Sequence, residues 1–154
     1  ILEPLAEAIF AQVLASHVTH GDDTGLRVLD NGAPGGSKKG HLWAFVGDRL
    51  WVAFRYTETW KGEEARAHVK ERRGWFQVDG YAGFDRLFHA EPKTIFVVGC
   101  WSHARRKYVE ALDGGDVRAA VAIAIIGKLF AIERDADTRG LTPGERCALR
   151  LRPR

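Results

Sequence analysis

A block of strand-like segments, followed by strands that alternate with helices, constrains the fold of this chain most. Residues 17–29 alternate as a strand does, with Val18 and Val28 on one parity. The segments 41–46 and 50–56 are rich in aromatic and β-branched residues and flank a Gly-Asp-Arg turn, which is typical of a hairpin. The early part of the chain is therefore predicted to form three antiparallel strands.

The rest of the chain alternates helices with short strands. Helices are predicted at 5–15, 61–72, 80–88, 101–112 and 116–136, and strands at 75–78 and 94–98. The segment 94–98 is apolar throughout, so it is expected to be buried on both faces. Thr142-Pro143-Gly144-Glu145 matches a capping box at the start of a last helix. These patterns predict an α/β fold with a five-stranded mixed sheet, flanking helices and a helical C-terminal part.

Length and composition exclude several classes of protein. The 154 residues suit a single domain over 1–154, and the fractions of hydrophobic (45%) and charged (28%) residues are near globular averages. The chain has no uninterrupted stretch of eighteen apolar residues, so no transmembrane helix is expected. Two cysteines give neither a disulfide framework nor a four-cysteine zinc site. A cytoplasmic protein is therefore expected.

The charge and the missing methionine add two expectations. The formal net charge is +3, which is weakly basic and compatible with a polyanionic partner without identifying one. The chain contains no methionine, so it is expected to be a fragment or a processed piece of a longer protein.

Three acidic residues occupy positions that suit a metal site. Asp22 lies within the first predicted strand, Asp79 follows a short strand, and Glu133 borders the apolar stripe of a long helix. Each also has a structural explanation: a turn for Asp22, a helix N-cap for Asp79 and an exposed helix charge for Glu133. Carboxylate oxygens from two strands and a helix would suit magnesium, which prefers oxygen ligands and retains waters.

Other candidates for binding lie around residue 100. Arg105, Arg106 and Lys107 form a basic cluster, although such clusters are more often solvated faces than DNA contacts. Cys100 and His103 could bind zinc, but two ligands do not make a site and no other cysteine or histidine has matching spacing. The basic end of the chain is formed by Arg146, Arg150, Arg152 and Arg154. Trp60 and Trp101, which polar residues flank, are the tryptophans best suited to stack on DNA bases.

Several motifs, taken in order, resemble those of transposases of the insertion sequence 66 family. They are HGDDT at 20–24, KKGHLW at 38–43, QVDGYAGF at 77–84, GCWSHARRKY at 99–108, LFAIER at 129–134 and GLTPGER at 140–146. The resemblance runs from Leu2 to about Leu149. Asp23 departs from it, since the family usually has glutamate there. Members of the family are several times longer than this chain.

The resemblance implies a ribonuclease H-like catalytic domain with an Asp-Asp-Glu triad that binds two magnesium or manganese ions. Matching by motif assigns the first acid to Asp22 and the second to Asp79. Asp22 shares its parity with Leu26 and Val28, so it is expected to point with these apolar residues, and Asp23 the other way. Glu133 is favoured as the third acid over Glu110, because Glu110 can pair with lysine or arginine on its own helix.

The activity implied is DNA transposition, which combines phosphodiester hydrolysis with strand transfer by a 3′-hydroxyl. DNA, as element ends and target, is the expected partner, contacted by Arg105, Arg106 and Lys107. His103 is expected either to contact DNA with them or to support the metal-binding carboxylates. A homo-oligomer that acts at the nucleoid is also expected. Two alternatives remain open: a structure-selective nuclease of the same fold, and an inactive DNA-binding remnant of a mobile element.

Overall fold

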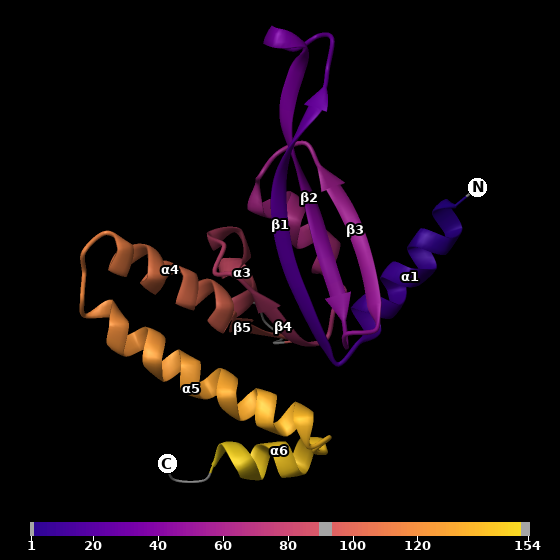
Figure 1. Cartoon of the computed structure of the whole chain (residues 1–154). Coiled ribbons are helices and arrows are strands. Elements are labelled where there is room, and N and C mark those ends of the chain that lie inside the picture. Colours follow the sequence, from indigo (N-terminus) through magenta and orange to yellow (C-terminus); the bar gives the residue numbers. More distant parts are fainter. Residues whose placement is uncertain (1, 90–93, 152–154) are drawn as a thin grey trace. The chain divides into compact units, whose positions relative to one another are not determined.

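The computed structural model describes residues 2–89 and 94–151. They fall into two compact units, a sheet unit up to Cys100 and a helical unit from Trp101 onward. Figure 1 shows the sheet unit in indigo to red-brown and the helical unit in orange to yellow.

The sheet unit contains the predicted hairpin strands and then the strands that alternate with helices. In chain order its elements are α1 (Glu3–Ala15), β1 (Val18–Leu29), the 3-10 turn η1 (Pro34–Gly36), β2 (Ser37–Gly47), β3 (Trp51–Thr57), α2 (Gly62–Val69), β4 (Gly74–Val78), the 3-10 turn η2 (Ala82–Phe84), α3 (Asp85–Phe88) and β5 (Ile95–Gly99).

The five strands form one mixed sheet in the order β3-β2-β1-β4-β5. β2 pairs antiparallel with both β3 and β1, whereas β4 pairs parallel with β1, and β5 parallel with β4. This mixed α/β topology confirms the predicted fold class and is consistent with a ribonuclease H-like fold. It places β1 beside β4, the strand that Asp79 follows.

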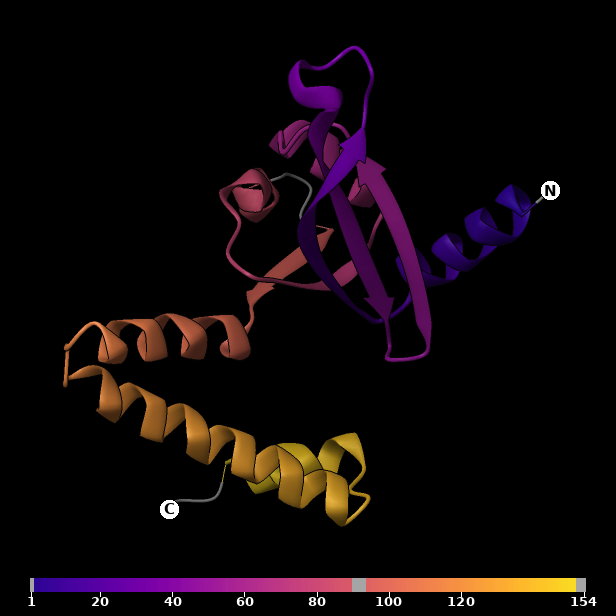
Figure 2. The ribbon, with the colours of Figure 1, turned by 45° about the horizontal axis from the view of Figure 1, so that its top comes forward.

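The outer half of β1 and β2 forms a two-stranded ribbon. β2 pairs with β3 only from His41 to Gly47, whereas β1 and β2 stay paired out to Leu29 and Ser37. Figures 1 and 2 both show this ribbon, capped by η1, extending past the end of β3.

The turn between β2 and β3 is bonded to the start of β1. Asp48 and Arg49 have φ angles of 47° and 60°, so the turn is left-handed, as two-residue hairpin turns require. The Asp48 carboxylate accepts hydrogen bonds from the backbone N–H groups of His17 and Val18, both at 2.9 Å. These bonds lower the pKa of Asp48, and the bond from Val18 has the larger effect.

Aromatic side chains dominate the core of the sheet unit. The largest fully buried apolar side chains are Trp43, Phe45, Phe76 and Phe84, which lie on β2, β4 and η2. Helix α1 packs against β2 and β3, and it contributes Val13 to this core. The core therefore lies on the face of the sheet that α1 covers.

Three predictions about this unit are corrected. β5 is an edge strand and Phe96 is 41% exposed, so the strand is not buried on both faces. The helix predicted over 80–88 is reduced to η2 and a short α3, because Gly80 has a φ of 93° and cannot continue a helix. Helix α2 ends at Val69, earlier than the predicted Arg72.

The helical unit contains α4 (Trp101–Asp113), α5 (Ala119–Thr138) and α6 (Pro143–Arg150). Figure 2 shows α4 running beside α5 and α6 folding back along the end of α5. The predicted capping box is confirmed: the Thr142 hydroxyl accepts from the Glu145 N–H, and the Glu145 carboxylate accepts from the Thr142 N–H. Among the helices that the structure describes, none is long and apolar enough to cross a membrane.

Candidate metal and DNA site

Asp22 and Asp79 form a pair of exposed carboxylates at the carboxyl end of β4. Asp22 lies in β1, Asp79 directly follows β4, and these strands pair in parallel through Val18–Trp75 and its neighbours. An oxygen of Asp22 and an oxygen of Asp79 lie within 4.8 Å of each other. Two hard oxygen donors at this separation, open to solvent, fit a magnesium or manganese ion that keeps part of its water shell.

The parity of Asp22 with Leu26 and Val28 predicted that it points with these apolar residues. This prediction is wrong, because Asp22 does not point into the core. At this part of β1 the odd-numbered side chains face the core: Thr19 is 0% exposed and Gly21 is buried, whereas Asp22 is exposed. Leu26 and Val28 lie farther out, in the ribbon that extends past β3, so their parity does not report the buried face at residue 22.

Backbone N–H groups orient both carboxylates. Asp22 Oδ1 accepts a hydrogen bond from the N–H of Asp23 at 3.0 Å. Asp79 Oδ1 accepts from the N–H of Tyr81 at 2.9 Å, across a turn that Gly80 closes with a positive φ. The structural role expected for Asp79 is thus a turn rather than a helix cap.

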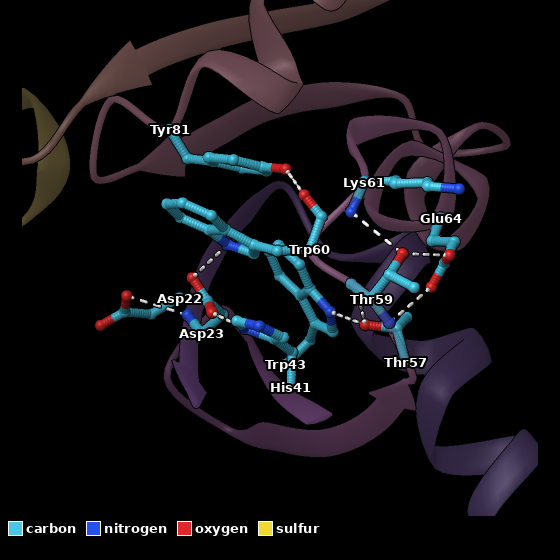
Figure 3. Close-up of polar contacts among 10 residues, drawn as sticks. All are labelled: Asp22, Asp23, His41, Trp43, Thr57, Thr59, Trp60, Lys61, Glu64 and Tyr81. Carbon is cyan, nitrogen blue, oxygen red and sulfur yellow. Dashed lines mark hydrogen bonds and ion pairs between the residues drawn. The ribbon is translucent and has the colours of Figure 1, made fainter. Parts of the chain in front are cut away.

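A stack of rings lies beside the acidic pair. Figure 3 shows the Trp60 indole between the Tyr81 ring and the His41 imidazole. The ring centroids are 4.5 Å from Trp60 to Tyr81 and 5.8 Å from Trp60 to His41, with interplanar angles of 16° and 8°. Rings of the protein itself therefore cover the faces of Trp60 that were expected to stack on DNA bases.

Asp23 connects this stack to the acidic pair. Its Oδ2 lies 2.8 Å from His41 Nδ1, and its Oδ1 accepts from the Trp60 indole N–H at 3.2 Å. The side chains of Asp23 and His41 are only 12% and 8% exposed. Sequence reasoning missed this group, although Trp60 itself and the HGDDT and KKGHLW motifs had drawn attention.

The segment that carries Trp60 is fixed by polar contacts on both sides. The Thr57 hydroxyl at the end of β3, which accepts from the Trp43 indole N–H at 2.8 Å, donates to the Thr59 carbonyl at 2.9 Å. The Thr59 hydroxyl donates to Glu64 at the start of α2. Hydrogen bonds from Thr59 lower the pKa of Glu64. The link between β3 and α2 is therefore tied to both elements.

Glu133 lies in α5 of the helical unit, where two arginines of α6 hold it. Arg150 donates to both of its oxygens at 2.7 and 2.9 Å, and Arg146 donates at 3.0 Å. These contacts, Arg150 first, lower the pKa of Glu133 to about 2. A structural role for Glu133, which was hard to find in the sequence, is thus an ion-pair cluster between α5 and α6.

The basic cluster of α4 is exposed and partly paired. Lys107 Nζ lies 2.9 Å from Glu110 Oε2 and Arg106 Nε lies 4.0 Å from Glu110 Oε1, which confirms the expected pairing along the helix. The hydrogen bond from Lys107 lowers the pKa of Glu110. Arg105 is exposed and His103 is partly exposed in the first turn of the same helix.

The basic end of the chain is partly neutralised, because Arg146 and Arg150 pair with acids of α5. Arg152 and Arg154 lie outside the described residues. Cys147 is a free thiol. Over residues 2–89 and 94–151, no group of three or more potential metal ligands includes a cysteine, so the alternative of a zinc site gains no support.

Comparison with known proteins agrees with the geometry. The sequence pattern described as "Transposase IS66 family" matches residues 1–153. The uncharacterized proteins y4qI and y4hP of Sinorhizobium fredii (strain NBRC 101917 / NGR234) are 31% and 30% identical over 97% of this chain. The uncharacterized protein y4jD of the same strain is 29% identical over 87% of it.

The chain spans about 30% of the length of these curated relatives. No solved structure matches it significantly. The family match covers nearly all of the sequence and includes the segments that carry Asp22, Asp79 and Glu133. This chain therefore belongs to the IS66 family of transposases.

Proposed function

We propose that this chain is the catalytic domain of a DDE transposase, with Asp22 and Asp79 as its first two metal-binding acids. The observation that carries the proposal is the approach of their oxygens to within 4.8 Å from adjacent parallel strands. Ligand sites collect at the carboxyl ends of such strands. Membership of the IS66 transposase family supports the same conclusion.

Two divalent cations, magnesium or manganese, would supply Lewis acidity. This would activate water or a 3′-hydroxyl and stabilise the leaving oxygen of a phosphodiester. Asp22 and Asp79 would hold them from one side, each oriented by a backbone N–H. Because both carboxylates are exposed, the opposite side stays accessible to a DNA phosphate.

We propose Glu133 as the third acid, with Glu110 as the alternative. A metal ligand must be ionised, and the low pKa of Glu133 meets that requirement. Its oxygens would have to exchange an arginine for a cation on binding. Glu110 is also ionised, but its partners lie on the exposed face of its own helix.

Arg105, Arg106 and Lys107, with His103, are proposed to contact the DNA backbone of element ends and target. Such contacts position the phosphates and make binding depend on salt, without specifying sequence. Assembly into a homo-oligomer and action at the nucleoid belong to the same proposal.

The decisive experiment compares Asp22→Asn and Asp79→Asn with Asp85→Asn, an exposed acid of α3 that serves as the matched control. We expect magnesium-dependent cleavage and joining of DNA carrying an element end to be lost in the first two variants and kept in the control. Cleavage without joining would favour the structure-selective nuclease, and DNA binding without cleavage in the unsubstituted chain would favour the inactive remnant. Retained activity in Asp22→Asn and Asp79→Asn would contradict the proposal.

The third acid is tested by comparing Glu133→Gln with Glu110→Gln in the same assay. We expect Glu133→Gln to abolish metal-dependent cleavage at a temperature where thermal unfolding shows the variant to be folded. Glu110→Gln should retain cleavage. The reverse result would reassign the third acid to Glu110 and leave the first two in place.

The DNA contacts are tested with the triple substitution of Arg105, Arg106 and Lys107 by alanine. Affinity should fall about equally for unrelated DNA sequences, and its dependence on salt should become weaker. Replacing Arg27, Lys39 and Arg49, three exposed basic residues of the sheet unit, removes the same charge and is the control. Equal losses in both triple variants would show that net charge, rather than this cluster, attracts DNA.

A further inference from the structure

Trp60 has a position that packing alone does not explain. It lies in the short link between β3 and α2, and it is 52% exposed. Nevertheless two rings stack on it, its indole N–H donates to Asp23, and its carbonyl accepts from the Tyr81 hydroxyl. A half-exposed side chain with this many directed contacts connects other parts of the structure more than it fills the core.

One end of the connection reaches Asp22. The Asp23 carboxylate is held on one oxygen by His41 and on the other by Trp60, while the Asp23 N–H donates to the Asp22 carboxylate. The side chain and the backbone of Asp23 therefore work together. Because the side chain of Asp23 is fixed, the direction of its backbone N–H is restricted, and so is the hydrogen bond that this N–H donates to Asp22.

The other end of the connection reaches Asp79. The Tyr81 ring stacks on Trp60 at 4.5 Å, and the backbone N–H of Tyr81 donates to Asp79 Oδ1 at 2.9 Å. The Tyr81 hydroxyl donates a hydrogen bond to the Trp60 carbonyl. Tyr81 thus touches Trp60 and Asp79 at once.

Two glycines allow the stack to close. A Cβ on Gly62, at the start of α2, would lie 2.7 Å from the Cα of Gly83 in η2. A Cβ on Gly83 would lie 2.1 Å from the Tyr81 ring. Since real Cβ atoms do not approach other heavy atoms this closely, glycine at both positions lets α2 and η2 meet and brings Trp60 against Tyr81.

We propose that Trp60 is a positioning residue that clamps the Asp22–Asp23 segment of β1 to the Asp79–Tyr81 turn and so fixes the separation of the two carboxylates. The inference rests on the proposed function, in which Asp22 and Asp79 bind the cations. Residues that orient metal ligands from behind contribute strongly to metal affinity, because they reduce the number of orientations that the ligands must give up on binding.

The test measures manganese binding by calorimetry, with thermal unfolding in parallel, on the whole chain. Trp60→Ala removes the ring and the N–H and should weaken manganese binding about tenfold. Trp60→Phe keeps a ring for the stack but removes the N–H, and should give a smaller loss with an unchanged unfolding temperature. Trp51→Ala, which removes a similarly exposed tryptophan of β3, is the control and should bind like the unsubstituted chain.

The outcomes separate the clamp from the function beneath it. If Asp22→Asn removes manganese binding while Trp60→Phe and Trp60→Ala bind normally, the clamp is refuted and the metal site stands. If Asp22→Asn and Asp79→Asn bind manganese as the unsubstituted chain does, the proposed function fails, and the clamp with it. Should Trp60→Ala not fold, Trp60→Phe decides: normal manganese affinity in a folded Trp60→Phe refutes the clamp.

Discussion

The two units of this chain are stabilised by different kinds of interaction. The sheet unit buries a cluster of large apolar side chains, among them Trp43, Phe45, Phe76 and Phe84. In the helical unit, the buried apolar residues among those described are Ala119, Ile126, Ala136 and Leu149, and α4 buries none. Ion pairs and a capping box take a larger share in the helical unit.

This difference affects how accurately each unit can place a functional side chain. Asp22 lies in β1, where it pairs with Ala44 of β2, and Asp79 directly follows β4, so the sheet's hydrogen bonds fix the backbone at or next to each acid. Glu133 is placed by two arginine side chains that reach across from α6. The position of Glu133 therefore depends on charge–charge contacts that salt screens.

The largest effect is expected in the sheet unit, from Arg72→Met. Arg72 is fully buried, and its guanidinium donates to the carbonyls of Leu14, Ser16, His17 and Trp75. Methionine fills similar space but removes the donors that Arg72 supplies, at about 1–3 kcal/mol for each carbonyl that is left with no other donor and that water cannot reach. The free energy of unfolding, measured in urea, should fall by about 3 kcal/mol or more.

Arg73→Met is the control for this prediction, because the neighbouring Arg73 is exposed and the same atoms are exchanged. It should leave the urea midpoint nearly unchanged. Equal losses in the two variants would mean that the buried bonds of Arg72 do not dominate the stability of the sheet unit.

Glu133→Gln should produce the next largest effect, and one that depends on pH. The pKa of Glu133 falls from an ordinary 4.5 to about 2 on folding, so its ion pairs stabilise the chain above pH 4.5 and are lost as the pH falls toward 2. The side chain is 36% exposed, so solvent screening limits the contribution to about 1 kcal/mol. Thermal unfolding of both chains, followed from about pH 2 to about pH 6, measures this contribution over the range in which it is lost.

In that series the unsubstituted chain should lose stability relative to Glu133→Gln as the solution becomes more acidic, and the two curves should converge near the lower end. Added salt should narrow the gap at neutral pH. Parallel curves at all pH values would show that the arginines of α6 do not hold Glu133 in solution.

Thr142→Ala tests the capping box of α6 and should cost about 1 kcal/mol. The substitution removes the hydroxyl that accepts from the Glu145 N–H and ends the reciprocal bonding at the start of the helix. Loss of helical signal in circular dichroism, at a temperature where the sheet unit stays folded, is the measurement. Thr138→Ala is the control, because that hydroxyl bonds to the Arg134 carbonyl within its own helix.

The smallest effect is expected from Glu110→Gln. Its pairs with Arg106 and Lys107 are exposed, and exposed pairs add little to stability. The unfolding temperature should hardly change, whereas affinity for DNA should rise slightly because a negative charge leaves the basic cluster. A clear loss of stability would show that α4 depends on these pairs.

Much of the fold could be predicted, because its signals are local. Turn residues between the aromatic runs located the β2–β3 hairpin, and a four-residue motif located the start of α6. The exposure of Asp22 could not be predicted from parity, since parity does not say which part of a long strand lies over a core. The β1 strand leaves the core after its first few residues and continues as a ribbon.

The partners of the candidate acids were also beyond the sequence. Asp23 meets His41 and Trp60 across 18 and 37 residues, and Glu133 meets Arg146 and Arg150 across 13 and 17. These contacts depend on how strands and helices are placed in three dimensions. A motif can mark a residue as unusual without showing which distant side chain holds it.

The ribbon of β1 and β2 leaves both of its outer edges open to strand addition. β4 pairs with β1 only at residues 18–20, and β3 with β2 only from His41 onward. Unpaired edges of this kind invite another chain to add a strand, which is a common route to aggregation. Arg27 and Lys39 place exposed positive charges along the ribbon, so that a second copy approaching edge to edge meets like charge. These charges on the ribbon therefore oppose edge-to-edge self-association of the chain.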